Sequence, residues 1–100
     1  MAVSNVRILG RKYTIKPVQN TDFYGRCHNK DAFIELLTDQ DEFGLKDTLL
    51  HEIMHAILHQ QGATHEYELE ESFVRPLATG IMTVLQDNPK LAQFLMEKIK

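Results

Sequence analysis

Two histidines and one glutamate lie within five consecutive residues near the middle of the chain. His51 and His55 are four residues apart, and Glu52 directly follows the first. Residues four apart on a helix project from the same face, so both imidazoles can bind one metal ion. Zinc takes such nitrogens at about 2.0–2.1 Å, and the glutamate can accept a proton from water that the metal activates. The motif therefore predicts a zinc site for attack on a carbonyl group, with Glu52 as the general base.

The surrounding residues help to choose between a metal site and an exposed polar stripe. Residues 49–58 are apolar wherever the motif leaves a choice, which is typical of a helix in the core. Ionisable side chains are costly to bury there without a partner, and a metal ion provides one. The alternative is an amphipathic helix that merely exposes Thr48, Glu52, His55 and His59 to solvent. We favour the metal site.

A catalytic zinc site needs a third protein ligand and one open position. His59 continues the histidine stripe, but at 1.5 Å per residue it lies about 12 Å along the helix axis from His51. That distance is too long for one shared ion, so we expect His59 to be a polar residue near the helix end. The third ligand should instead come from the next helix, which Gly62 turns back across the first.

Several side chains in that next segment can bind a metal: His65, Glu66, Glu68, Glu70 and Glu71. Glu70 shares a helix face with the apolar residues that should face the core. We therefore predict Glu70 as the third ligand, with Glu66 and Glu71 as alternatives. Glu68 and Glu71 are expected to point more nearly to solvent, and ordinary surface charge is the competing interpretation for each glutamate.

The first half of the chain is predicted to form a small, mostly antiparallel sheet of three or four strands. Gly10-Arg11 and Asn29-Lys30 are the expected turns, and the second strand should stop before Pro17. The strands are expected at residues 3–9, 13–16, 23–28 and 32–37.

The second half is predicted to be helical. Polar and acidic residues at 38–41 can begin the first helix, and Gly62 can end it. Pro76 should kink the second helix or mark a late start, and Pro89 can open the third. The three helices are expected over residues 41–61, 66–86 and 90–99. The apolar stripe of the second helix comprises Leu69, Phe73, Leu77, Ile81 and Val84 or Leu85. Strands followed by helices indicate one α+β domain over residues 1–100.

Composition narrows the class of protein. Eleven basic and fourteen acidic residues leave a formal charge of −3, which gives no electrostatic reason to expect a nucleic acid partner. The single cysteine, Cys27, excludes an internal disulfide and a cysteine-based zinc ribbon. We find no apolar core of a signal peptide and no stretch apolar enough to span a membrane. These features favour a cytoplasmic protein.

Three segments together resemble short phage and prophage metallopeptidase-like proteins. They are Leu50–His59, the acidic run Glu70-Glu71-Ser72-Phe73-Val74, and Leu85-Gln86-Asp87-Asn88-Pro89. Such proteins are distantly similar to the ImmA/IrrE group of bacterial zinc peptidases, which are gluzincin-like. The resemblance covers about residues 5 to 95, and the HExxH core is its most specific part.

The resemblance implies a minimal zincin fold, in which a small sheet is followed by the active-site helix and a helix that supplies a glutamate ligand. It implies His51 and His55 as zinc ligands and Glu52 as general base. It also implies a bacterial or phage-encoded protein that acts on a protein or peptide substrate. Larger relatives often cleave a DNA-binding repressor, so a repressor-like regulator is one candidate substrate.

Three functional hypotheses follow. The leading one is a zinc endopeptidase, in which residues 32–37 form an edge strand that pairs with an extended substrate. The alternative for that segment is an ordinary strand packed within the sheet. The second hypothesis is a phage accessory protein of zincin fold that binds metal or a partner without useful peptidase activity. The third, a DNA-associated SprT-like protease, is disfavoured by the missing cysteine ribbon and the acidic balance.

A few other residues are weaker candidates for a role in the site. Tyr24, Tyr67 and His65 can each stabilise a developing oxyanion, and spacing does not choose among them. Cys27 and His28 are adjacent and can bind a metal, although we expect them to be ordinary strand and turn residues.

Overall fold

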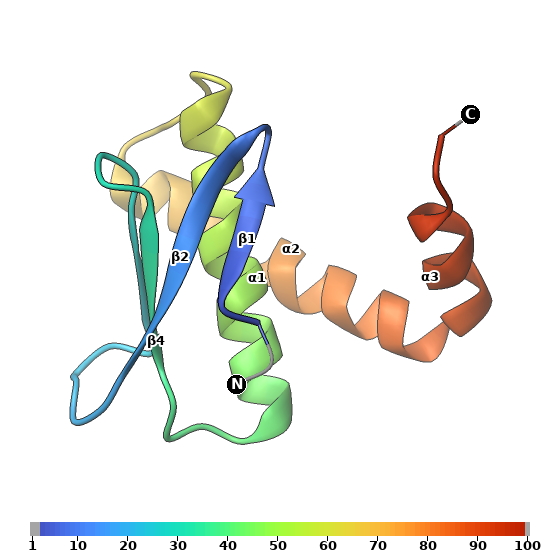
Figure 1. Cartoon of the computed structure of the whole chain (residues 1–100), viewed down its shortest axis with the longest axis horizontal. Helices are drawn as coiled ribbons and strands as arrows, with labels where there is room; N and C mark the ends of the chain where they lie inside the picture. Colours follow the sequence, from blue (N-terminus) through green and yellow to red (C-terminus); the bar gives the residue numbers. More distant parts are fainter. Residues whose placement is uncertain (1–2, 100) are drawn as a thin grey trace.

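Strands precede helices in the computed structural model, which describes residues 3–99. The strands are β1 (Asn5–Ile8), β2 (Arg11–Val18), β3 (Gly25–His28) and β4 (Phe33–Leu37). The helices are α1 (Glu42–Gln60), α2 (Tyr67–Asp87) and α3 (Pro89–Met96). The predicted α+β class is confirmed. Figure 1 shows α1 packed along one face of the sheet, while α2 crosses α1 and carries α3 away from the sheet.

The sheet is mixed, with strand order β1-β2-β4-β3. The outer pairs β1–β2 and β3–β4 are antiparallel, whereas β2 and β4 are parallel. The expectation of a mostly antiparallel sheet therefore holds for the two outer pairings. The expectation of an edge strand at residues 32–37 is wrong, because β4 lies between β2 and β3. After β2 the chain skips one strand position and forms β3 at the edge of the sheet. The β3–β4 hairpin then places β4 in the position between β3 and β2.

The β1–β2 hairpin turns at Leu9 and Gly10, one residue earlier than expected. Ile8 pairs with Arg11, so the loop contains only these two residues. Their φ angles are 49° and 87°, because a two-residue hairpin turn that matches the twist of the strands needs the left-handed region.

Pro17 lies inside β2 rather than after it. The backbone N–H of Ile15 donates to Ser4 on the β1 side of the strand, and the nitrogen two residues later faces the same side. Pairing with β1 extends along β2 only as far as Thr14. The missing N–H of Pro17 therefore costs no hydrogen bond of the sheet.

α1 covers the inner face of the sheet. Its apolar residues Leu45, Leu49, Ile53 and Ile57 pack against the buried side chains of the strands. The buried core comprises Ile8, Tyr13, Ile15, Ile34, Leu36 and Ala56. This packing turns the opposite side of α1, which carries both histidines of the motif, towards α2.

The predicted limits of α1 are confirmed to within a residue. The side chain of Asp41 accepts a hydrogen bond from the Gly44 N–H at 2.7 Å, which caps the first turn. At the other end Gly62 has φ 66°, and the next N–H, that of Ala63, donates to the Leu58 carbonyl at 2.8 Å. This is the arrangement in which a glycine ends a helix.

α2 differs from its predicted orientation. It runs without interruption through Pro76, so a late start is excluded. Its buried apolar residues are Val74 and Ala78, whereas Leu77 and Ile81 of the expected core stripe are 50% and 40% exposed. The reason is that α2 contacts α1 and α3 but none of the described strands, and its second half has no sheet beneath it (Figure 1). No helix among the described residues is both long and apolar enough to cross a membrane.

Candidate metal centre

The two histidines of the motif meet two consecutive glutamates where α1 and α2 cross. The Nε2 atoms of His51 and His55 are 3.1 Å apart. Oε1 of Glu71 lies 2.7 Å from the His51 Nε2 atom and in close contact with the His55 Nε2 atom. Three potential ligand atoms from three side chains therefore converge on one point.

Glu70 and Glu71 contact different atoms of the histidine pair. The predicted ligand Glu70 contacts Nδ1 of His55 through Oε2, and its Oε1 accepts the backbone N–H of His65 at 3.3 Å. It therefore lies behind the imidazole, where a carboxylate orients a histidine. Glu71, one of the two alternatives, lies on the side of the Nε2 atoms. The expectation that Glu71 points to solvent is wrong, because its side chain is only 12% exposed.

The remaining predicted ligands are not part of this cluster. Glu66 is the N-cap residue of α2 and is exposed, as is Glu68 in the first turn. His59 lies in the last turn of α1, as expected. The four side chains of the centre are therefore His51, His55, Glu70 and Glu71, and the second helix contributes two of them.

The Nε2 side of the cluster contains more acceptors than donors. Because Glu70 accepts from Nδ1 of His55, a neutral His55 presents the lone pair of Nε2 to Glu71 and His51. Such an arrangement needs a cation at its centre. In the absence of a metal ion, a proton on His55 provides the positive charge. Burial lowers the pKa of His55, but the hydrogen bonds to Glu70 and Glu71 outweigh it and raise the pKa above its ordinary value.

Glu71 is ionised in this arrangement. Burial by itself raises its pKa, but hydrogen bonds from Arg75, His51 and His55 outweigh burial and lower the pKa. Arg75 donates to the second carboxylate oxygen, Oε2, at 3.0 Å. Arg75 was not among the residues predicted for the site, although its spacing of four residues from Glu71 on a helix is a signal for this ion pair.

Glu52 is buried between α1 and the edge strand β3. Glu52 is 8% exposed, and burial raises the pKa of its carboxyl group above the ordinary value. A cavity of about 420 Å³ is lined by Glu52, His55, Glu70 and Glu71 on one side. Residues of the chain around β3 line the other side, namely Phe23, Gly25, Arg26, Cys27 and Asn29. Glu52 and the cluster of histidines and glutamates therefore border one open cavity.

Comparison with known proteins identified no relative of this chain. No family model, no curated protein and no solved structure matches the chain.

The candidate oxyanion residues differ in their distance from the site. Tyr67 borders the cavity over Glu52, and Tyr24 borders an adjoining cavity that also reaches His51 and Glu52. Their side chains are 71% and 68% exposed. The ring of His65 instead packs edge-on against Phe73. The structure thus brings the two tyrosines to the site.

Cys27 and His28 point to opposite faces of β3 and do not share a site. Cys27 faces the core and borders the cavity, and burial first, then the charges of Glu52 and Glu70, raises the pKa of its thiol to about 12. A thiol with this pKa stays protonated at neutral pH and is a poor nucleophile. His28 lies on the outer face of the sheet, where it contacts Glu35 at 2.5 Å.

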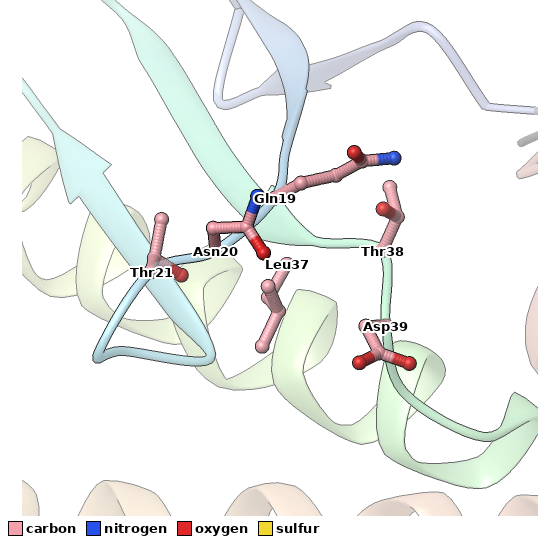
Figure 2. Close-up of a pocket in the computed structure, with 6 residues that line it drawn as sticks. All are labelled: Gln19, Asn20, Thr21, Leu37, Thr38 and Asp39. Atoms are coloured by element: carbon pink, nitrogen blue, oxygen red, sulfur yellow. The ribbon is translucent and has the colours of Figure 1, made fainter.

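Another pocket, of about 470 Å³, lies at the end of the sheet where β2 and β4 stop. Figure 2 shows side chains from the segment after β2 and from the segment after β4 around it. It shares no lining residue with the cavity over the histidines, and Asp39 is its only ionisable side chain. It offers no second group for acid–base or metal chemistry.

Gly25 allows β3 to approach α1 at the candidate base. A β-carbon at this position would lie 2.6 Å from Cγ2 of Thr48 and 3.2 Å from Cγ of Glu52. We expect Gly25→Ala to destabilise the fold by about 1–3 kcal/mol, because overpacking forces the strand or the helix to move. Urea unfolding of the purified variants measures this change in free energy.

The substitution Thr48→Ser should restore part of the stability that Gly25→Ala loses. Serine lacks the clashing methyl group but keeps the hydroxyl that donates to Gln40 at 3.0 Å, so Gly25→Ala should cost less in the Thr48→Ser background than in the parent. Gly80→Ala is the matched control, because a β-carbon there meets nothing within 4 Å and alanine favours a helix. Equal stability of Gly25→Ala and the parent would contradict the close approach.

Proposed function

We propose that the chain is a zinc-dependent peptidase of minimal zincin-like fold. His51, His55 and Glu71 would hold the metal, with Glu70 orienting His55 and Glu52 acting as general base. The observation that carries this proposal is the convergence of two Nε2 atoms and one carboxylate oxygen beside a buried glutamate at an open cavity. Glu71 takes the place of Glu70 as the proposed third ligand.

The donor set fits zinc. Two imidazoles and one carboxylate with a fourth position open form one of the known ligand sets of catalytic zinc sites. Tetrahedral zinc with bonds of 2.0–2.2 Å holds its ligand atoms about 3.3 Å apart. The His51–His55 separation of 3.1 Å needs to widen by about 0.2 Å and the His51–Glu71 separation of 2.7 Å by about 0.6 Å. The closer contact between His55 and Glu71 has to open further. Arg75 contacts the second oxygen of Glu71, and Glu70 contacts Nδ1 of His55. Outer partners of metal ligands make contacts of this kind.

Bound zinc would supply Lewis-acid activation of water and of the scissile carbonyl group. The residues of the chain supply the remaining parts of the reaction. Glu52 borders the same cavity as His55 and Glu71, so its carboxylate can take the proton of the attacking water and return it to the leaving amine. Its burial raises its pKa, which favours a group that exchanges protons near neutral pH. Tyr24 and Tyr67 line a cavity that also reaches His51 and Glu52, and either hydroxyl would donate to the developing oxyanion.

We propose an extended peptide as the substrate. The cavity opens along β3, which is an edge strand. The free edge of such a strand presents backbone groups that can pair with an added strand. β3 thus takes the role that the sequence analysis gave to residues 32–37. A repressor-like regulator stays one candidate among protein substrates.

The test is metal-dependent hydrolysis of an unfolded polypeptide. Protein freed of metal by a chelator should be inactive and should regain activity with about one equivalent of zinc per chain. His55→Ala, prepared in the same way, should neither bind zinc stoichiometrically nor cleave. Cleavage that is unchanged by metal removal would contradict the proposal. Stoichiometric zinc binding without cleavage of any substrate would support the second hypothesis, a metal-binding accessory protein.

A further inference from the structure

Charge is unevenly distributed along the chain. Residues 1–30 contain six Lys or Arg residues and one acid, whereas residues 31–100 contain five and thirteen. The two segments therefore carry +5 and −8, which together give the formal charge of −3. The small total charge therefore hides two regions that carry larger charges of opposite sign.

The strands place most of the basic residues on the outer face of the sheet. Arg7 of β1 lies opposite Lys12 of β2, and Lys16 of β2 and Arg26 of β3 lie on either side of Glu35. All four basic side chains are exposed, while the alternate residues of β2, Tyr13 and Ile15, point into the core. We call this face, formed by Arg7, Lys12, Lys16, Arg26, His28 and Phe33, the basic sheet face.

The basic sheet face is open to solvent and positively charged. α1 packs on the other face, and α2 and α3 contact the helices rather than the strands (Figure 1). Glu35 is the only acidic residue within the four described strands, and it is paired with His28 at 2.5 Å. Four permanent positive charges therefore face solvent with one acidic residue among them. This arrangement attracts a polyanion.

Aromatic rings are interleaved with these charges. Phe33 is stacked with His28 at a centroid distance of 4.1 Å, and Nζ of Lys16 lies 3.8 Å from the Phe33 centroid. Arg26 lies over the ring of Phe23 at 4.1 Å. Positive charge that tracks a backbone, combined with rings on which bases stack, characterises surfaces that bind single-stranded nucleic acid. An acidic polypeptide would use the charges but would have no use for the rings.

We propose that the basic sheet face binds single-stranded nucleic acid. The proposed metal centre lies on the helical side of the sheet, and the two regions meet at Arg26 and Phe23, which also line the cavity over Glu52. Binding at this face differs from the expectation of no nucleic acid partner, which was drawn from the total charge of the chain. Binding should be largely independent of base sequence, because charge and stacking do not read base edges.

The test is binding of a fluorescent oligothymidine by anisotropy over a range of salt concentrations. With four phosphate contacts the slope of log K against log salt should be about −3, from roughly −0.7 per contact on a single strand. The variant Lys12→Glu/Lys16→Glu should bind at least about tenfold more weakly at low salt. Lys90→Glu/Lys98→Glu is the matched control, because it changes the net charge equally away from the sheet.

The variant Phe33→Leu tests whether the aromatic rings contribute to nucleic acid binding. It keeps every charge and should weaken binding about fivefold or more with an unchanged salt slope. Equal losses in the two double-lysine variants would reduce the effect to overall charge and overturn the proposal, as would no binding by the parent at low salt. Equally tight binding of polyglutamate, unaffected by Phe33→Leu, would assign the face to an acidic protein instead. Circular dichroism of each variant checks that the fold is retained.

Discussion

Glu52→Gln should lower the rate of peptide hydrolysis by about 10²–10⁴-fold while the protein still binds one zinc per chain. The amide has nearly the shape of the carboxylate, so it fits the same buried space, but it cannot accept the proton of the attacking water. Initial rates on an unfolded substrate and the zinc content of the same preparations measure the two properties separately.

Glu68→Gln is the control for Glu52→Gln. It removes one negative charge from an exposed position in the first turn of α2, and it should leave both rate and zinc content unchanged. Full activity in Glu52→Gln would mean that another group transfers the proton. Loss of zinc in that variant would mean that Glu52 belongs to the ligand set.

Glu71→Gln should weaken zinc binding far more than Glu70→Gln. Glu71 points its Oε1 at both Nε2 atoms, whereas Glu70 contacts only the rear nitrogen of His55. Loss of an outer partner of a metal ligand typically costs 10–100-fold in affinity, so we expect about that loss for Glu70→Gln and a larger one for Glu71→Gln. Competition with a chromophoric chelator gives both dissociation constants.

The same titration separates the alternatives among the glutamates. Glu66→Gln should bind zinc like the parent, because Glu66 is exposed at the N-cap of α2. A larger loss for Glu70→Gln than for Glu71→Gln would reinstate the ligand that the sequence pattern favoured. Parent-like binding by all three variants would place the third ligand outside this acidic segment.

Local signals predicted α1 well. A capping aspartate, an apolar face and a terminal glycine all act within a few residues of one another, and the helix begins and ends where they indicate. The four residue spacing of His51 and His55 likewise brought both rings to one face. Such features depend only on residues within one or two helical turns of each other, so they can be recognised from a short stretch of sequence.

The position of β4 could not be predicted from local signals. The segment from Phe33 to Leu37 has the composition of a strand in either an edge or an interior position. Its parallel pairing with β2 depends on where the loop after β2 places β3. That choice is made by long-range contacts, so the hairpin signals between neighbouring strands do not reveal it.

The positions of Glu70 and Glu71 around the histidines could not be predicted, for a different reason. The apolar stripe of α2 was assumed to mark the side that faces the core, but Leu77 and Ile81 are half-exposed and the small residues Val74 and Ala78 face α1. Small side chains let the two helices approach, which brings both glutamates within reach of the histidines. Consecutive helical residues differ by about 100° in direction, so the two carboxylates contact opposite sides of His55.

The central claim is that one zinc ion lies between His51, His55 and Glu71. A crystal structure of the zinc-loaded protein, with anomalous data at the zinc edge, tests it most directly. The account predicts one strong anomalous peak per chain, about 2.0–2.2 Å from both Nε2 atoms and from a Glu71 oxygen, with Glu70 still on Nδ1 of His55. A peak bound by Glu70 instead of Glu71, or a zinc-loaded crystal with no peak at the histidine pair, would contradict it.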